Sequence, residues 1–380
     1  MTRLRAAALV VPVLLLAGCS SGGDNVRGDS APSTQGGTDA STSNGIDPER
    51  IAATDDVFAE FGEGSPGCAV AVRLASGEVH DAQFGERDID RALPIGPDTV
   101  FDVASVSKQF TAGVIALLSM EGTISLEDDI TDHINEIGPF DATITIDDLL
   151  HHTSGLPDYI GLLDAGYGDV TTMEDALDVI ASDDGAPTAE PGTLFEYSNT
   201  NYVLLALIVE RVTSMSMSDA VAERIFEPLG MQSSLVRDDQ GSLLELQAVG
   251  YDGNDGGWTP VGSAWRQTGD GAVHSTPTDL VKWAELFLAG PAEQTGLGSA
   301  DWLALMMEPG DVGDGDDRYG GGLELVGEGD DLVLGHTGSW IGYGSALVMQ
   351  PSTGVAVAVT CNIEGVDAET LAQDTFDIWT

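Results

Sequence analysis

Patterns typical of β-strands lie at both ends of this chain, and patterns typical of helices lie between them. The strand-like runs are residues 68–74, 78–84, 322–326, 331–334, 344–349 and 355–360. A period near 3.6 residues predicts helices at 48–62, 110–120, 146–150, 202–213, 280–288 and 368–378. This order predicts an α/β (α+β) fold, in which a sheet is built from both chain ends and a helical lobe is inserted at about 100–290. We expect a ligand site in the crevice between sheet and lobe.

The first residues predict export. Two arginines precede an apolar run at residues 6–17, which is too short to span a membrane and ends in small residues. We therefore expect a signal peptide over residues 1–18. The ending Leu16-Ala17-Gly18-Cys19 resembles the lipobox of bacterial lipoproteins, in which the cysteine is lipidated. The alternative is an ordinary signal peptide that happens to contain a cysteine.

Residues 19–46 predict a tether between this anchor and a folded body at 47–380. The segment is rich in serine, glycine, threonine and aspartate and has almost nothing to bury, which is typical of a flexible linker. A lipidated Cys19 would place two acyl chains in the bilayer, and each buried CH₂ contributes about 0.8 kcal/mol. We therefore expect an exported protein anchored at the extracytoplasmic face of the cell membrane.

The charge excludes some partners. The chain has 14 basic and 63 acidic residues, a net charge of −49, which argues against nucleic acid as a partner. High salt screens such self-repulsion, so a salt-loving or marine habitat is one interpretation and a generally acidic proteome is the other. We expect a monomer whose partners are a small-molecule or peptide substrate and, through the lipid anchor, the membrane.

Two cysteines remain in the expected body, Cys68 and Cys361, and each lies in a strand-like run. A pair of cysteines in an exported chain is compatible with a disulfide. Two buried thiols are the alternative.

The first candidate catalytic stretch contains Ser105 and Lys108. Lysine is nearly absent from this chain, since Lys108 and Lys282 are the only two. The i, i+3 spacing at the start of a helix places both side chains on one face. A serine there can attack a carbonyl while its own N–H stabilises the oxyanion, and a desolvated lysine can accept its proton. By itself the pattern is weak, because a capped helix with a surface lysine also fits it.

Two further stretches strengthen this interpretation. Tyr197 and Asn199 lie in a loop before a helix, where a phenol beside a cationic lysine would be easier to deprotonate and an amide could orient a substrate. His336-Thr337-Gly338-Ser339 lies at the end of a predicted strand. Gly338 would let a substrate backbone approach, and the N–H of Ser339 would complete an oxyanion hole with that of Ser105.

Taken in order and spacing, Ser105-x-x-Lys108, Tyr197-x-Asn199 and His336-Thr337-Gly338 resemble the three motifs of the class C β-lactamase and D-alanyl-D-alanine carboxypeptidase family. The runs 149–157, 197–202 and 227–231 are also similar to family stretches, and the resemblance covers about residues 47–380. It implies a β-lactamase/transpeptidase-like fold with an antiparallel sheet flanked by helices. It also implies that the first and last strands are neighbours, which would bring Cys68 close to Cys361.

The same resemblance implies that Ser105 forms an acyl-enzyme and that Lys108 and Tyr197 handle its protons. Asn199 would orient the substrate amide, and His336 and Thr337 would line the facing wall. Many relatives carry lysine at the position of His336, and histidine is mostly neutral near pH 7. We therefore favour an esterase or a D-amino-acid-related peptidase over a β-lactamase.

From another class, a tethered lipoprotein that binds or senses cell-wall ligands without turnover remains an alternative. No cofactor is expected. No metal is expected either, because His151-His152 has no third ligand at a usable spacing.

Overall fold

The structure, a computed structural model, describes residues 46–239, 243–254, 257–288, 290, 296–310, 312 and 317–380. The expected signal segment, Cys19 and the tether up to residue 45 lie outside the described residues. Within the described ranges no helix has the length and apolar character needed to cross a membrane.

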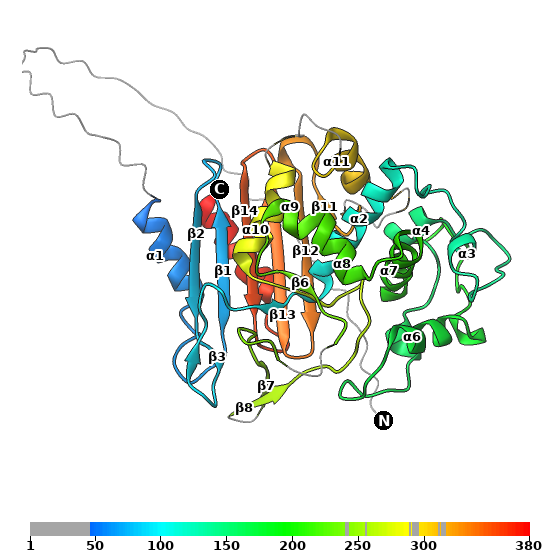
Figure 1. Cartoon of the computed structure of the whole chain (residues 1–380). Helices are drawn as coiled ribbons and strands as arrows, with labels where there is room; N and C mark the ends of the chain where they lie inside the picture. Colours follow the sequence, from blue (N-terminus) through cyan, green and yellow to red (C-terminus); the bar gives the residue numbers. More distant parts are fainter. Residues whose placement is uncertain are drawn as a thin grey trace, which may run out of the picture. The chain divides into compact units, whose positions relative to one another are not determined.

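The main sheet joins the two ends of the chain, as predicted. Its seven strands lie in the order β10-β11-β12-β13-β14-β1-β2, and every neighbouring pair is antiparallel. In Figure 1 the blue strands from the start of the body lie beside the red and orange strands from its end. The bounds are β1 Cys68–Arg73, β2 Val79–Phe84, β10 Asp317–Tyr319, β11 Glu324–Val326, β12 Val333–Trp340, β13 Tyr343–Gln350 and β14 Val355–Cys361.

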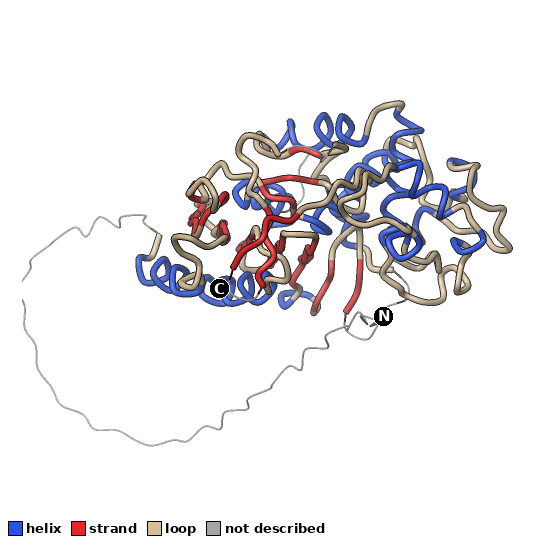
Figure 2. The backbone as a smooth tube through the Cα atoms, turned by 90° about the horizontal axis from the view of Figure 1, so that it is seen from below, coloured by secondary structure: helices blue, strands red, loops and turns tan. Residues whose placement is uncertain are grey.

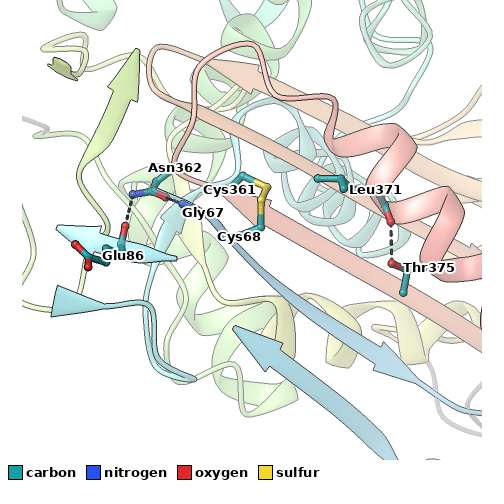
Figure 3. Close-up of a disulfide and its surroundings, with 7 residues drawn as sticks. All are labelled: Gly67, Cys68, Glu86, Cys361, Asn362, Leu371 and Thr375. Atoms are coloured by element: carbon teal, nitrogen blue, oxygen red, sulfur yellow. Dashed lines mark hydrogen bonds between the residues drawn. A yellow bond between two sulfur atoms is a disulfide. The ribbon is translucent and has the colours of Figure 1, made fainter. Parts of the chain in front are cut away.

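A disulfide joins β1 to β14. The register of this pair places Cys68 opposite Cys361, and both residues are fully buried. Their sulfur atoms form a bond of 2.07 Å (Figure 3). The bridge lies beside the side chain of Asn362, whose Oδ1 accepts from the backbone N–H of Gly67 at 2.8 Å. The junction between the first and last strands is therefore closed both covalently and by hydrogen bonds.

The two faces of the sheet are covered by different helices (Figure 2). The side chains of β14 point alternately to the two faces. On one face, Val355, Val357 and Val359 pack with the helices α1 (Pro48–Val57) and α12 (Ala368–Trp379). The alanines between these valines join the opposite core, to which α10 (Pro277–Leu288) contributes. Because successive strand residues point to opposite faces, one strand supplies both cores.

The inserted lobe packs into the second of these cores, so lobe and sheet share a continuous interior. Its helices are α2 Lys108–Met120, α3 Ile130–His133, α4 Ile146–Leu150, α5 Tyr159–Leu162, α6 Met173–Ile180, α7 Asn199–Thr213, α8 Met217–Val221 and α9 Glu227–Leu229; α11 is Ala300–Met307. In Figure 1, α3, α4, α6 and α7 of this lobe lie to the right of the sheet. α4 begins with a capping box in which Thr145 and Asp148 satisfy each other's backbone N–H groups.

The region 100–290 also contains short strands that the sequence did not predict. The segments are β5 Phe101–Asp102, β6 Leu235–Val236, β7 Gly250–Asn254, β8 Gly257–Val261 and β9 Val273–Ser275; β3 Glu86–Asp88 and β4 Leu93–Pro94 form a further pair. These strands have two to five residues, so their alternation is too short to be distinguished from loop sequence. The order β5-β9-β6 matters for the site, because β9 pairs with β5, which lies just before Ser105 in the chain.

Candidate active site

Ser105 lies in a 3₁₀ turn, η1 (Ala104–Ser107), that leads directly into α2. The preceding Ala104 has φ of +48°, a left-handed conformation that is costly for a residue with a side chain. Asp102 stabilises it, because its Oδ1 accepts a hydrogen bond of 2.9 Å from the backbone N–H of Ala104. The nucleophile candidate is therefore held on a tight turn at the entrance of a helix.

Lys108 is fully buried and has three oxygen partners. Its Nζ donates to Ser105 Oγ at 3.1 Å, to Asn199 Oδ1 at 2.8 Å and to the backbone carbonyl of Asp270 at 2.8 Å. Burial lowers the pKa of Lys108 to about 8, although the carboxylates of Asp270 and Asp158 oppose this shift. A substantial neutral fraction near pH 8 makes this amine a suitable base for the serine beside it.

Asn199, the first residue of α7, is held at both ends of its amide. Its Oδ1 faces the lysine, while its Nδ2 donates to Asp158 Oδ2 at 2.8 Å. Asp158 also caps α5, since its Oδ1 accepts from the backbone N–H of Ile160. Asp158 therefore holds the Asn199 amide, and this amide in turn holds Lys108. The sequence analysis did not predict the role of Asp158.

Tyr197 lies close to Lys108, as predicted, but its pKa is raised, whereas the sequence predicted that it would be lowered. The Lys108 Nζ lies 4.9 Å from the centre of its ring, and its hydroxyl interacts with Ser105. Burial around the hydroxyl raises the pKa of Tyr197 well above 10, although 37% of the whole residue remains exposed. The expectation of an easier deprotonation is therefore wrong, because desolvation of the hydroxyl is the largest effect on its pKa. A neutral phenol can still relay a proton.

His336 lies inside β12 and not at its end, because the strand continues through both glycines to Trp340. Its ring is buried, with Nδ1 next to the carbonyl of Thr337 and Nε2 3.0 Å from the hydroxyl of Tyr319. A carbonyl only accepts, so Nδ1 carries the hydrogen and Nε2 accepts from the tyrosine. Burial and the nearby Lys108 lower the pKa of His336 to about 3. This histidine is neutral.

Gly338 allows a close contact within the protein itself. A Cβ added there would lie 2.3 Å from Ser345 Oγ and 2.4 Å from the carbonyl oxygen of Val103. The glycine therefore allows the backbone before η1 to approach β12. Thr337 is half-buried on the strand's other face.

A pocket of about 100 Å³ lies beside Ser105, the candidate nucleophile. Three of the predicted residues line it, namely Ser105, Asn199 and the exposed Ser339 of β12. The remaining lining residues were not predicted; they are Asp102, Ala104, Tyr159, Ile160, Trp265, Gln267, Asp270, Gly271, Ala272 and Trp340. Because Ser105 and Ser339 both line this pocket, it is compatible with an oxyanion hole formed by their two backbone N–H groups.

His152 lies at the site, although the sequence analysis considered it only as a metal ligand and discounted that role. Its Nδ1 accepts from the backbone N–H of Ser198 at 3.2 Å and from Asn201 Nδ2 at 3.0 Å. Its ring lies 4.4 Å from that of Tyr197, centre to centre. Burial lowers the pKa of His152 well below 6.5, so it is neutral. It supports the loop that carries Tyr197 and Asn199.

A serine hydrogen-bonded to a buried lysine between an antiparallel sheet and a helical lobe defines a class of protein, the serine hydrolases with a mixed α/β fold. The sequence matches the family described as Beta-lactamase over residues 54–378. The chain belongs to this family.

Two curated relatives are similar to most of the body. Penicillin-binding protein 4* of Bacillus subtilis (strain 168) is 29% identical over 281 residues, which are 70% of this chain and 61% of that protein. Protein flp of Staphylococcus aureus (strain N315) is 28% identical over 309 residues, 78% of this chain and 60% of that protein. This chain thus matches less than two thirds of the length of either relative.

Solved structures show the same fold. The D-amino acid amidase from Ochrobactrum anthropi SV3 complexed with L-phenylalanine amide has a TM-score of 0.74 and 26% identity, covering 87% of this chain and 98% of that one. The octameric penicillin-binding protein homologue from Pyrococcus abyssi has a TM-score of 0.76 and 27% identity, covering 87% and 76%. A class C β-lactamase, at 19% identity and a TM-score of 0.72 over 88% and 98%, is similar in fold.

Proposed function

We propose that this protein hydrolyses ester, amide or D-amino-acid peptide bonds through an acyl-enzyme on Ser105. The observation that carries the proposal is the buried Lys108, whose Nζ lies 3.1 Å from Ser105 Oγ and whose pKa is lowered to about 8. Each step of acyl transfer needs a group that takes a proton and returns it, and this amine is suited to that task.

The proposed reaction starts with neutral Lys108. Its Nζ accepts the Ser105 proton while Oγ attacks the substrate carbonyl, and the backbone N–H groups of Ser105 and Ser339 stabilise the oxyanion. Collapse of the tetrahedral intermediate breaks the bond to the leaving group, which receives the proton from Lys108 through the Tyr197 hydroxyl. Water then attacks the acyl-enzyme and gives a proton to the same amine. As the bond between the acyl group and Ser105 breaks, Lys108 returns this proton to Oγ, and the acid is released.

The electrostatics of the site favour substrates that lack a required carboxylate. His336 is neutral and buried, and no lysine, arginine or histidine of the described residues lines the pocket. A substrate carboxylate would therefore find no cation in this pocket. A class C-like β-lactamase is the alternative within the hydrolases, and the class C neighbour supports the fold alone.

Steady-state hydrolysis of a matched pair of activated esters tests the proposal. One ester is neutral and the other has a carboxylate on its acyl group, and both are measured with the wild type and with Ser105→Ala. We expect turnover of the neutral ester, a preference for it over the anionic one, and loss of turnover in the variant by at least about 10³-fold. A single burst without turnover would favour the non-turnover binding protein, and turnover that survives Ser105→Ala would refute the assignment.

We also propose export and lipid anchoring at Cys19, with the body at the extracytoplasmic membrane face. The disulfide between Cys68 and Cys361 supports an oxidising compartment. Metabolic labelling with a fatty-acid analogue, with Cys19→Ala as control, tests the anchor; label that persists in the variant would contradict it.

A further inference from the structure

The walls of the pocket beside Ser105 combine carboxylates with aromatic rings. Asp102 and Asp270 line it together with Tyr159, Trp265 and Trp340. Among the charged residues described, those that line the pocket are both acidic. The combination of a carboxylate and several aromatic faces is typical of sites that bind an organic cation.

The rings form a connected cluster. Trp265 lies 6.3 Å from Tyr159 and 5.6 Å from Trp340, measured between ring centres. Tyr167 lies 5.3 Å from each of the two tryptophans and extends the cluster outward. The faces of electron-rich rings attract cations at distances up to about 6 Å. A small cation in this pocket would therefore meet aromatic surface as well as carboxylate oxygens.

Asp270 is a pocket carboxylate that interacts with Lys108. It is buried at 8% exposure, its Oδ2 accepts from the Tyr159 hydroxyl at 3.0 Å, and its own backbone carbonyl accepts from Lys108. Lys108 is the cation that balances its charge. When Lys108 is neutral and able to take the serine proton, that positive charge is absent, and a buried carboxylate without a countercharge is costly.

We propose that the pocket takes an acyl group that carries a cationic amine next to the scissile carbonyl, held by the Asp270 carboxylate and the faces of Tyr159, Trp265 and Trp340. This proposal rests on the proposed function, because the amine is part of the substrate that Ser105 attacks. The substrate class is then an amide or ester of an amino acid with a free amino group.

The size of the pocket agrees with this assignment. Its volume of about 100 Å³ is ample for a small organic group. An ammonium group and a short side chain fit this space. The amine also brings the positive charge that Asp270 lacks when Lys108 is neutral, so substrate binding and the active protonation state of Lys108 favour each other.

A pair of isosteric substrates tests the proposal directly. Alanine 4-nitroanilide and isobutyryl 4-nitroanilide differ in one group, an ammonium in the first and a methyl in the second. We expect the wild type to prefer the alanine compound, in its D or L form, by at least about 100-fold in kcat/KM after division by the rates of hydroxide-catalysed hydrolysis. The corresponding 4-nitrophenyl esters serve if the anilides react slowly.

Two variants test whether the preference for the amine depends on Asp270. Asp270→Asn is expected to reduce the ratio of the two kcat/KM values by at least about 10-fold, whatever its effect on either rate alone. Asp301→Asn, an exposed residue at the start of α11, removes one negative charge elsewhere and is expected to leave the ratio unchanged. A ratio that is unchanged in Asp270→Asn, or that falls equally in Asp301→Asn, would overturn the proposal.

A measurement on the wild type covers the case in which Asp270→Asn does not fold. Isopropylammonium is expected to inhibit hydrolysis of the isobutyryl ester competitively, and isobutyrate is not. Stronger inhibition by isobutyrate would overturn the proposal. If the isobutyryl ester is hydrolysed in a Ser105-dependent manner without any preference for the amine, the hydrolase stands and the amine site is wrong. If neither ester is hydrolysed through Ser105, the proposed function itself fails.

Discussion

At the scale of single residues, the site depends on where protons are held. Lys108 has a pKa lowered to about 8, whereas His336 and His152 are neutral well below pH 7 and Tyr197 is neutral well above it. The group that titrates close to pH 8 is therefore the lysine, coupled to Asp270, whose pKa burial raises to about 6. The apparent values belong to this pair.

The pH profile of kcat/KM for a neutral ester follows from this assignment. Lys108 must be neutral to accept a proton, so activity is expected to rise with pH through an apparent pKa near 8. The Asp158 carboxylate stabilises the charged lysine, and Asp158→Asn keeps an oxygen for Asn199 while removing that charge. The rise in activity is then expected to move to lower pH, by a few tenths of a unit to about one unit. A shift to higher pH would contradict the role of Lys108.

His152 is predicted to act by positioning Tyr197 and Asn199. His152→Phe keeps a ring but removes the acceptor for Ser198 and Asn201, and we expect kcat to fall by about 10- to 100-fold with a smaller change in KM. His152→Asn offers an oxygen near the place of Nδ1 and tolerates the positive φ of 57° at this position, so it should recover part of the lost rate. Equal losses in both variants would indicate a purely structural role.

At the scale of elements, the contact between η1 and β12 sets the distance from nucleophile to strand. Gly338 makes this contact possible, and Gly338→Ala would push a methyl group against the carbonyl of Val103. We expect a loss of about 1–3 kcal/mol in stability and at least about a 10-fold loss of kcat/KM. Denaturant unfolding and ester hydrolysis measure the two effects. Gly262→Ala, where nothing lies within 4 Å of the new methyl, is the control and should change neither.

Part of the site follows from local sequence and part from long-range packing. The i, i+3 spacing of Ser105 and Lys108 at a helix entrance predicted their contact, and Asn199 was placed at the start of its helix within three residues. Asp270 carried no comparable signal. It reaches Lys108 because Gly269, at φ of +98°, lies so close to α7 that a Cβ there would be 2.3 Å from the carbonyl of Tyr202. Such a contact cannot be read from sequence periodicity.

The length of β12 shows a similar limit. The predicted strand ended at residue 334, whereas β12 continues to Trp340 because β13 pairs with it along most of its length. A glycine weakens a strand only slightly where hydrogen bonds to the neighbouring strand hold it and a nearby segment needs the space that a side chain would take. The strands at the chain ends were predicted more accurately, because alternating or continuous apolar residues such as those of 355–361 mark buried strands directly.

At the scale of the whole molecule, the disulfide closes the sheet across 293 residues of sequence. Replacing Cys68 and Cys361 together by alanine is expected to reduce the free energy of unfolding by about 2–4 kcal/mol, because the unfolded chain loses a long-range constraint. Urea unfolding without reductant measures this change. The kcat of the folded variant should stay at the wild-type value, since neither cysteine belongs to the site. An unchanged midpoint would show that the bridge contributes little.

Trapping the acyl-enzyme tests the central claim most directly. The protein is quenched in acid during hydrolysis of a slowly released activated ester, and its peptides are analysed by mass spectrometry. The account predicts one acyl group on the peptide that contains Ser105, absent in Ser105→Ala and strongly reduced in Lys108→Met. An acyl group on another residue, or full turnover without any acylated peptide and undiminished in Ser105→Ala, would contradict it.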